Sequence, residues 1–285
     1  MTDKYAVIGN PVAHSKSPVI HAEFARQTGH DISYIALYAP RDGFRSAALG
    51  FRDAGGRGLN VTLPFKHEAW RLAGERSGFA AAAGAVNTLE FRGRDIVGYN
   101  TDGIGLVRDI RDNLQCALVG RRILVMGAGG AAYGVIEPLL QERPEAIVIA
   151  NRTPEKAQAL VAHFAAFAPL AARGLTARGY ADLRDERFDI VVNATSAGLD
   201  DAMPPLPEAS FAAGALAYDM VYGRITPFLR FAAAHGARIA DGTGMLVEQA
   251  AESYSIWRGI RPQTAPVIAM LKRELTARGS GAPQA

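Results

Sequence analysis

The segment RRILVMGAGGAA, residues 121–132, constrains the fold more than any other part of the sequence. Its apolar run ends in Gly127 and Gly129, and Ala132 completes the spacing G-x-G-x-x-A at the start of a helical pattern. Small residues there allow a tight turn, in which backbone N–H groups at a helix N-terminus approach a pyrophosphate. The motif is informative only between a strand, a helix and a second strand. That context is present, so we predict a dinucleotide-binding unit.

The second half of the chain repeats this alternation of apolar runs and helical patterns. Further apolar runs followed by turn residues occupy residues 145–153, 188–198 and 215–223. Helical patterns separate them at about 131–141, 154–167 and 226–235. Continuous apolar strands that alternate with helices are typical of a parallel sheet covered on both faces. We therefore predict a Rossmann-type, doubly wound parallel sheet.

The first half reads as a separate α/β block. Strand-like runs occupy residues 5–9, 32–38 and 58–63, and a hairpin is expected around Arg92–Gly93–Arg94. Ser17 is the expected N-cap of a helix that ends at Gly29. A further helix is expected from Gly103 to about Asn113.

Two helical patterns, 245–259 and 264–277, close the chain without adding a strand to the second half. We expect both to return to the first block. The predicted fold class is therefore α/β with two domains. A substrate-binding domain comprises residues 1–103 and 244–285, and a dinucleotide-binding domain comprises residues 104–243.

Composition narrows the class of protein. The 285 residues carry 31 basic and 28 acidic side chains, without a basic run of the kind that binds nucleic acid. The single cysteine, Cys116, excludes internal disulfides and fits a reducing compartment. We find no apolar run of membrane-spanning length, no signal-peptide pattern and no metal-ligand spacing. We expect a cytoplasmic protein without nucleic-acid, membrane or metal partners.

The strand AIVIA is followed by NRTPEKA, where NAD sites usually place an acidic residue on the ribose 2′-hydroxyl. Here Asn151, Arg152 and Thr153 take that place, and Lys156 follows one turn later. A guanidinium offers a planar fork of donors that matches a phosphate. The alternative is an ordinary basic helix start. We predict NADP(H) as the cofactor.

Ser15 and Ser17 lie two residues apart at the start of the first helix, in GNPVAHSKSPVIH. Hydroxyl donors at a helix N-terminus can bind a carboxylate. The alternative is a plain N-cap by Ser17, which leaves Ser15 without a role. Both interpretations stay open on these residues alone.

The stretch NVTLPFKHEA, residues 60–69, places Lys66 just after Pro64, where an extended segment gives way to a helical pattern. On this stretch alone, the simplest interpretation is a solvated lysine at the start of a helix.

Nine short motifs then combine over the region from residue 6 to about 270: GNPVAHSKSP, NVTLPFK, GAVNTL, GYNTDG, GAGGAA, NRT, NATSAG, DMVY and DGTGMLVEQA. In this order they closely resemble the shikimate dehydrogenase family, NADP-dependent enzymes of aromatic biosynthesis. The resemblance implies a reversible reduction of 3-dehydroshikimate to shikimate with NADPH.

The resemblance also implies roles for individual residues. Lys66 and Asp102 would be the catalytic pair. The substrate-binding residues would be Ser15 and Ser17 for the carboxylate, Thr62, Asn87 and Asp102 for the ring hydroxyls, and Tyr222 and Gln249 across the cleft. The cofactor-binding residues would be Gly127, Ala128, Gly129, Gly130, Ala131, Asn151, Arg152, Thr153, Lys156, Thr195, Met220 and Gly244.

Two positions depart from the family pattern. Ala22 stands where many members have asparagine, and Lys156 stands where arginine is frequent. Neither departure concerns the reacting atoms, although the second would soften the preference for a 2′-phosphate.

The chemistry requires residues of these types. Reducing a ketone needs a hydride on carbon and a proton on oxygen, and the nicotinamide supplies only the hydride. A lysine can polarise the carbonyl and pass the proton, while a neighbouring aspartate stabilises the ammonium. The acid–base role then belongs to the pair.

Two other functions are compatible with the same scaffold. One is a dehydrogenase that also accepts quinate or uses NAD, which depends on the room beside Ser15 and Ser17. The other is a non-catalytic NADP-binding regulatory protein, which predicts loss of the pair; Lys66 and Asp102 are both present. We expect a monomer or a homodimer.

Overall fold

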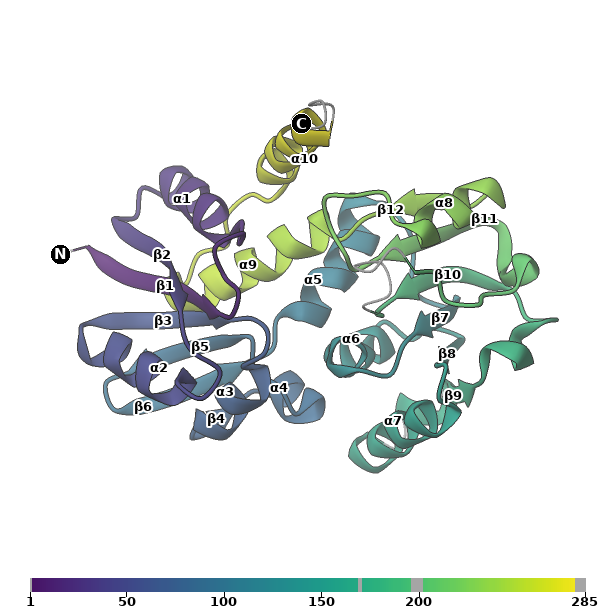
Figure 1. Ribbon diagram of the computed structural model, residues 1–285, viewed down its shortest axis with the longest axis horizontal. Helices are drawn as coiled ribbons and strands as arrows, with labels where there is room; N and C mark the ends of the chain where they lie inside the picture. Colours follow the sequence, from purple (N-terminus) through teal and green to yellow (C-terminus); the bar gives the residue numbers. More distant parts are fainter. Residues whose placement is uncertain (1, 169–170, 196–201, 280–285) are drawn as a thin grey trace. The chain divides into compact units, whose positions relative to one another are not determined.

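The computed structural model describes residues 2–168, 171–195 and 202–279 (Figure 1). The chain divides into two compact units. The first runs up to Gly105 and includes Val247–Val267, and the second comprises Leu106–Leu246 and the chain from Ile268 onward. The sequence predicts residues 244–285 in the first domain, whereas the described residues from Ile268 group with the second unit. No helix in the described ranges has both the length and the apolar character that a membrane span requires.

The first unit contains a six-stranded sheet in the order β2-β1-β3-β5-β6-β4. β1 runs parallel to β2 and β3, whereas β5 is antiparallel to both β3 and β6. The carboxyl ends of β1, β3 and β6 therefore share one edge of the sheet with the amino end of β5. The strands are β1 (Asp3–Gly9), β2 (Ile32–Tyr38), β3 (Gly56–Val61), β4 (Glu75–Arg76), β5 (Thr88–Arg92) and β6 (Asp95–Tyr99).

Helices cover both faces of this sheet because successive side chains of a strand point to opposite faces. On one face, Ala6 and Ile8 pack in a core with Phe44 and Phe65. On the other, Tyr5 stacks on Trp257 with the ring centroids 4.7 Å apart. The helices that contribute are α1 (Ser17–Thr28), α2 (Phe44–Asp53), α3 (Lys66–Leu72), α4 (Gly78–Ala83) and, from Val247 on, α9 (Thr243–Arg258).

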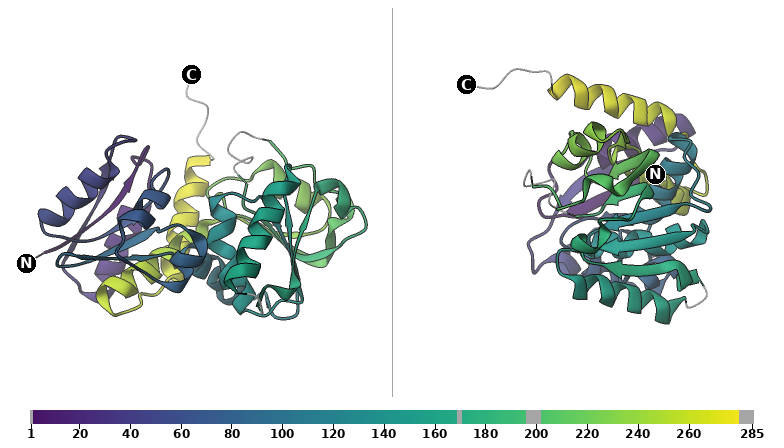
Figure 2. Two further views of the ribbon diagram at one scale, coloured as in Figure 1. Left: turned by 90° about the horizontal axis from the view of Figure 1, so that it is seen from below. Right: turned by 90° about the vertical axis from the view of Figure 1, so that its right-hand side faces the viewer.

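The second unit contains a six-stranded sheet in the order β12-β11-β10-β7-β8-β9, and every pair of neighbours is parallel. Figure 2 shows its teal-to-green strands side by side. The chain leaves β7 in one direction and returns to its other side at β10, so the order reverses between these strands. The strands are β7 (Arg122–Met126), β8 (Ala146–Ala150), β9 (Leu175–Arg178), β10 (Phe188–Asn193), β11 (Phe211–Asp219) and β12 (Arg238–Ala240).

Ile123, Leu124, Val125 and Met126 are all fully buried, as a strand covered on both faces requires. The predicted doubly wound parallel sheet is confirmed. Its helices are α6 (Gly130–Gln141), α7 (Pro154–Phe167), α8 (Pro227–Ala234) and, from Ile268, α10 (Ala265–Gly279).

The predicted elements are present, with two kinds of difference. The helix expected from Gly103 to Asn113 is α5 (Asp102–Arg108) followed by a π-helical turn at Asp109–Asn113. The sequence did not predict α2, α4, or the short strands β4, β9 and β12. The three strands lie at or next to sheet edges and hold two to four residues each, too few to give a periodic pattern.

Candidate active site

The shared edge of the first sheet brings the ends of β1 and β3 together. The Thr62 N–H donates to the carbonyl oxygen of Ile8 at 3.0 Å. A Cβ atom at Gly9 would overlap the Cγ2 of Thr62, so only glycine allows this approach. Thr62 is thereby held at the edge where the polar residues of the unit gather.

Lys66 is the first residue of α3, as the change of pattern after Pro64 predicted. The fully buried Phe65 anchors this helix start. The Lys66 Nζ donates to the Oδ2 of Asp102 at 2.6 Å, and the two side chains are 29% and 15% exposed. Lys66 is therefore an ion-paired, partly buried lysine and not the solvated one that its local sequence allowed.

Asn87 holds the other oxygen of Asp102. Its Nδ2 donates to the Oδ1 of Asp102 at 2.8 Å, while its Oδ1 accepts from the backbone N–H of Thr101 at 2.9 Å. A carboxylate only accepts and a backbone N–H only donates, so the orientation of this amide is unambiguous. The Oε1 of Gln249, from α9, lies 3.3 Å from the same Nδ2. Four predicted site residues thus form one cluster.

The two serines follow β1 and lie at the start of α1. The N-cap is Lys16, in helical conformation, so the prediction that Ser17 caps the helix was wrong. Instead, the Ser17 N–H donates to the Oγ of Ser15 at 3.2 Å. The Ser15 oxygen acts as an acceptor in this contact, so its hydroxyl proton remains available for a further acceptor.

The sequence did not single out the polar residues behind this cluster, which are the partly buried Tyr34 and the buried Asn60, Thr88, Thr101 and Ser253. Asn60, Thr88 and Thr101 each lie beside a predicted residue or within a quoted motif, and that adjacency was the available signal. Ser253 had no such signal.

His21 is also buried in this unit, in a site lined by rings. It stacks on Tyr34 with the centroids 4.1 Å apart and the planes at 6°. Burial lowers the pKa of His21 to about 3, although the nearby Asn60 amide opposes this shift. The imidazole is therefore neutral at physiological pH.

The predicted cofactor residues lie at the carboxyl edge of the second sheet. Gly127 follows β7 with a φ of 102°, and a Cβ there would lie 3.0 Å from the Cγ2 of Thr195, which follows β10. These two strands flank the reversal of strand order, where sheets of this type bind their ligands. Cβ atoms at Gly129 and Gly130 would meet nothing within 4 Å, so open space lies over the N-terminus of α6.

Asn193 connects two further predicted residues. Its Oδ1 accepts from the Thr195 hydroxyl at 2.7 Å, and its backbone oxygen accepts from the Met220 N–H at 3.1 Å. Gly244 lies in the first turn of α9, where a Cβ would overlap the buried carboxylate of Asp109. Tyr222 follows β11 and is 36% exposed.

The residues after β8 have the chemistry of a phosphate site. Arg152 and Lys156 are exposed, and no acidic side chain follows the strand before Glu155. The Asn151 Nδ2 donates to the Thr153 carbonyl at 2.9 Å, which shapes the turn. Burial raises the pKa of Tyr180 to about 12, and the positive charge of Arg152 opposes that rise. Together with the open glycine turn, this donor set fits NADP(H).

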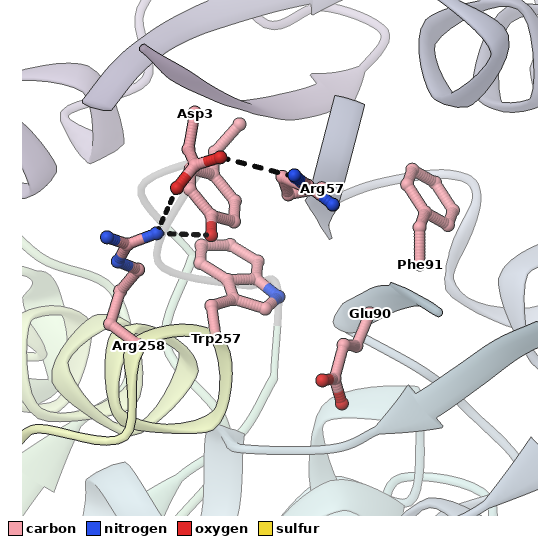
Figure 3. Close-up of a pocket in the computed structure, with 7 residues that line it drawn as sticks. Asp3, Arg57, Glu90, Phe91, Trp257 and Arg258 are labelled. Carbon is pink, nitrogen blue, oxygen red and sulfur yellow. Dashed lines mark hydrogen bonds and ion pairs between the residues drawn. The ribbon is translucent and has the colours of Figure 1, made fainter. Parts of the chain in front are cut away.

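A separate pocket of about 240 Å³ lies in the first unit, at the amino end of β1 (Figure 3). Asp3 pairs there with the Nε of Arg57 at 3.2 Å and with the Nη1 of Arg258. Both guanidinium groups lower the pKa of Asp3. Because the two cations share this carboxylate, we interpret the group as an ion-pair cluster that fastens the end of α9 to the sheet.

Three family models match successive parts of the chain. The Shikimate dehydrogenase substrate binding domain matches residues 7–89, Shikimate / quinate 5-dehydrogenase matches residues 109–199, and the Shikimate 5′-dehydrogenase C-terminal domain matches residues 242–272.

Relatives and solved structures agree with these matches. A shikimate dehydrogenase (NADP(+)) of Nitrosospira multiformis is 58% identical over 277 residues, covering 96% of this chain and 99% of the relative. The crystal structure of an Ael1 enzyme from Pseudomonas putida is 48% identical with a TM-score of 0.89, covering 95% of this chain and 98% of that one. Shikimate 5-dehydrogenase from Thermus thermophilus, solved with NADP(H) and shikimate, is 33% identical with a TM-score of 0.84. The match covers 96% of this chain and 100% of that one. The chain belongs to the NADP-dependent shikimate dehydrogenase family.

Proposed function

We propose that this chain catalyses the reversible reduction of 3-dehydroshikimate to shikimate in aromatic (chorismate) biosynthesis, with Lys66 and Asp102 as its acid–base pair. As a member of this family it is an oxidoreductase that uses NADP(H). The observation that carries the residue assignment is the 2.6 Å contact between the Lys66 Nζ and the Asp102 Oδ2, beside the amide of Asn87.

The reduction adds a hydride to the ring carbon and a proton to the ring oxygen. When bound, the nicotinamide cofactor supplies the hydride chemistry. The ammonium of Lys66 donates the proton to the reacting oxygen, and in the oxidation direction the amine accepts it. Asp102 holds the Lys66 Nζ in place and stabilises its charged form, so the proton transfer belongs to the pair.

The remaining substrate contacts follow from the hydrogen-bond donors and acceptors that these side chains offer to the carboxylate and ring hydroxyls of the substrate. The hydroxyl groups of Ser15 and Ser17, at the N-terminus of α1, bind the substrate carboxylate. Thr62, Asn87 and Asp102 bind the ring hydroxyls, together with Gln249 and Tyr222.

The cofactor contacts follow the same logic. Gly127–Ala131 receive the pyrophosphate on backbone N–H groups at the start of α6. Asn151, Arg152, Thr153 and Lys156 hold the 2′-phosphate. Thr195, Met220 and Gly244 hold the nicotinamide half.

An absorbance assay at the NADPH band tests this function. Shikimate and quinate are each offered with NADP⁺ and with NAD⁺. We expect the fastest reduction of cofactor with shikimate and NADP⁺. The match to the family model named Shikimate / quinate 5-dehydrogenase makes quinate the alternative substrate to test. Equal rates for both substrates would instead indicate a quinate/shikimate dehydrogenase, and no turnover of either would contradict the proposal.

We also propose a cytoplasmic location and a monomeric or homodimeric assembly, without nucleic-acid or membrane partners. The single cysteine and the near balance of charge support this proposal. Size-exclusion chromatography with light scattering measures the assembly, and a larger species would contradict it.

A further inference from the structure

Three buried polar side chains lie behind the proposed substrate contacts of the first unit. Asn60 is 6% exposed, and Thr88 and Ser253 are fully buried. Burying such groups costs free energy unless each finds a hydrogen-bond partner. Their contacts therefore indicate what they hold in place.

Asn60 connects the other two. Its Nδ2 donates to the Oγ1 of Thr88 at 3.1 Å and to the Oγ of Ser253 at 2.9 Å. Its own orientation is fixed from the other side, because the Tyr34 hydroxyl donates to the Asn60 Oδ1 at 2.7 Å. Both hydroxyl groups thus accept from Asn60, and each keeps its own proton to donate.

The acceptors near those two protons belong to Asn87 and Gln249, two residues proposed to bind the substrate. The Thr88 Oγ1 lies 3.0 Å from the Oδ1 of Asn87, and the Ser253 Oγ lies 3.0 Å from the backbone oxygen of Gln249. The two hydroxyl oxygens are themselves 2.8 Å apart. The two hydroxyl groups bridge the start of β5, directly after Asn87, and α9, which carries Gln249.

The orientation of the Asn87 amide matters for the chemistry. Only its Nδ2 can donate to the Asp102 carboxylate, and a flipped amide would place one acceptor against another. The Thr88 hydroxyl adds a donor at the Oδ1 of Asn87, beside the N–H and the hydroxyl of Thr101. The flipped amide would face these donors with its own NH₂ group.

We propose that Thr88 and Ser253 are positioning residues, which orient the Asn87 amide and fix Gln249 beside it for contact with the ring hydroxyls of the substrate. This inference rests on the proposed function of Asn87 and Gln249. Thr88 and Ser253 do not touch the substrate themselves, and both act through Asn87 and Gln249.

The test compares Thr88→Val, which removes the hydroxyl at nearly constant volume, with Thr88→Ser, which keeps it. We expect Thr88→Val to raise the KM for shikimate about three- to tenfold, the effect of one hydrogen bond. The KM for NADP⁺ should stay within about twofold, and the KM of Thr88→Ser for shikimate should be close to the wild-type value. Ser253→Ala should raise the KM for shikimate by a smaller factor than Thr88→Val does. Ser255→Ala, on the same helix but outside this cluster, is the matched control, and circular dichroism checks that each variant folds.

A double-mutant cycle separates the possible failures. If Thr88 acts through Asn87, the effect of Thr88→Val should disappear in an Asn87→Ala background. The same fold-change in both backgrounds would overturn the positioning role. An Asn87→Ala variant with an unchanged KM for shikimate would instead contradict the proposed function of Asn87. Equal increases in the KM for shikimate and NADP⁺ would reduce Thr88 to a structural role.

Discussion

The proposed substrate side and the proposed cofactor side of this protein are built in opposite ways. In the first unit, the Lys66 Nζ and the Asp102 Oδ2 are 2.6 Å apart, and the buried amides and hydroxyl groups beside them are hydrogen-bonded to one another. In the second unit, Gly129 and Gly130 border open space, and Arg152 is exposed. One side is organised before any ligand arrives, whereas the other offers groups that a ligand completes.

The difference has a physical reason. Proton transfer depends on the distance between the reacting groups, so a catalytic pair benefits from neighbours that fix it in advance. A phosphate brings its own charge, so the cations that recognise it can stay hydrated until it binds. The following predictions test this comparison, in order of decreasing effect.

Lys66→Ala should have the largest effect. We expect kcat to fall by roughly 10²–10⁴, the range for a positioned acid–base group. Lys66→Arg should not restore activity, because arginine does not release a proton near neutral pH. Steady-state kinetics measures the loss, and fluorescence titration of substrate and cofactor is the binding control. A Lys66→Ala enzyme with near-normal kcat would remove Lys66 from the chemistry.

Asp102→Asn should lower kcat and also weaken shikimate binding. It replaces a charged acceptor, so kcat/KM should fall by about 10–150-fold, corresponding to 1.5–3 kcal/mol. The same kinetic assay measures the change. Binding of NADP⁺ should be unchanged, because the proposed cofactor contacts are made by other residues. A fall in kcat with no change in shikimate affinity would show that Asp102 serves only Lys66.

Arg152→Ala tests the exposed side of the comparison. We expect the affinity for NADP⁺ to fall by about 1.5–3 kcal/mol, the contribution of a hydrogen bond to a charged group. The affinity for NAD⁺ should change little, because it lacks the 2′-phosphate. Fluorescence titration with both cofactors measures the two constants. Equal losses would contradict the assignment of Arg152 to that phosphate.

Ser15→Ala and Ser17→Ala should each raise the KM for shikimate by about two- to tenfold, the effect of one hydrogen bond. The KM for NADP⁺ serves as the internal control. The same substitution should raise the KM for shikimate methyl ester less than the KM for shikimate, since the ester lacks the charged acceptor. Identical losses for acid and ester would leave the serines with a purely local role at the start of α1.

The neutral, buried His21 makes the first unit sensitive to acid. Its pKa is about 3 in the folded chain and about 6.5 when unfolded. Because the folded value is lowered, this contribution to stability is complete above pH ~6.5 and is lost as the pH falls toward ~3. The free energy of unfolding should therefore fall by up to about 1.4 kcal/mol per pH unit in this window.

Urea denaturation between pH ~7.5 and ~4.5 measures this dependence. His21→Phe should remove it, so the stability of the wild type relative to the variant should decline as the pH falls. His163→Gln, at an exposed position, is the control and should keep the wild-type dependence. Parallel curves for the wild type and His21→Phe would show that His21 does not titrate in this way.

The sequence predicted the central strands of the second unit, β7, β8, β10 and β11, and the helices between them, but not its short strands β9 and β12. The turn after β7, the basic residues after β8 and the alternation of apolar runs with helices are local patterns, because each joins residues that are neighbours in the chain. The hairpin of β5 and β6 and the change to helix at Lys66 were local in the same sense. The family resemblance then named residues that the structure brings together, such as Lys66 with Asp102.

The contacts that support those residues follow from tertiary packing. Ser253 meets Thr88 because α9 packs against the sheet, across 165 residues of chain. His21 stays neutral because Tyr34 and its other neighbours exclude water from it. The N-cap of α1 is Lys16 and not Ser17, and the Ser17 N–H donates to the Oγ of Ser15. Such contacts depend on which surfaces pack together, and no stretch of neighbouring residues encodes that.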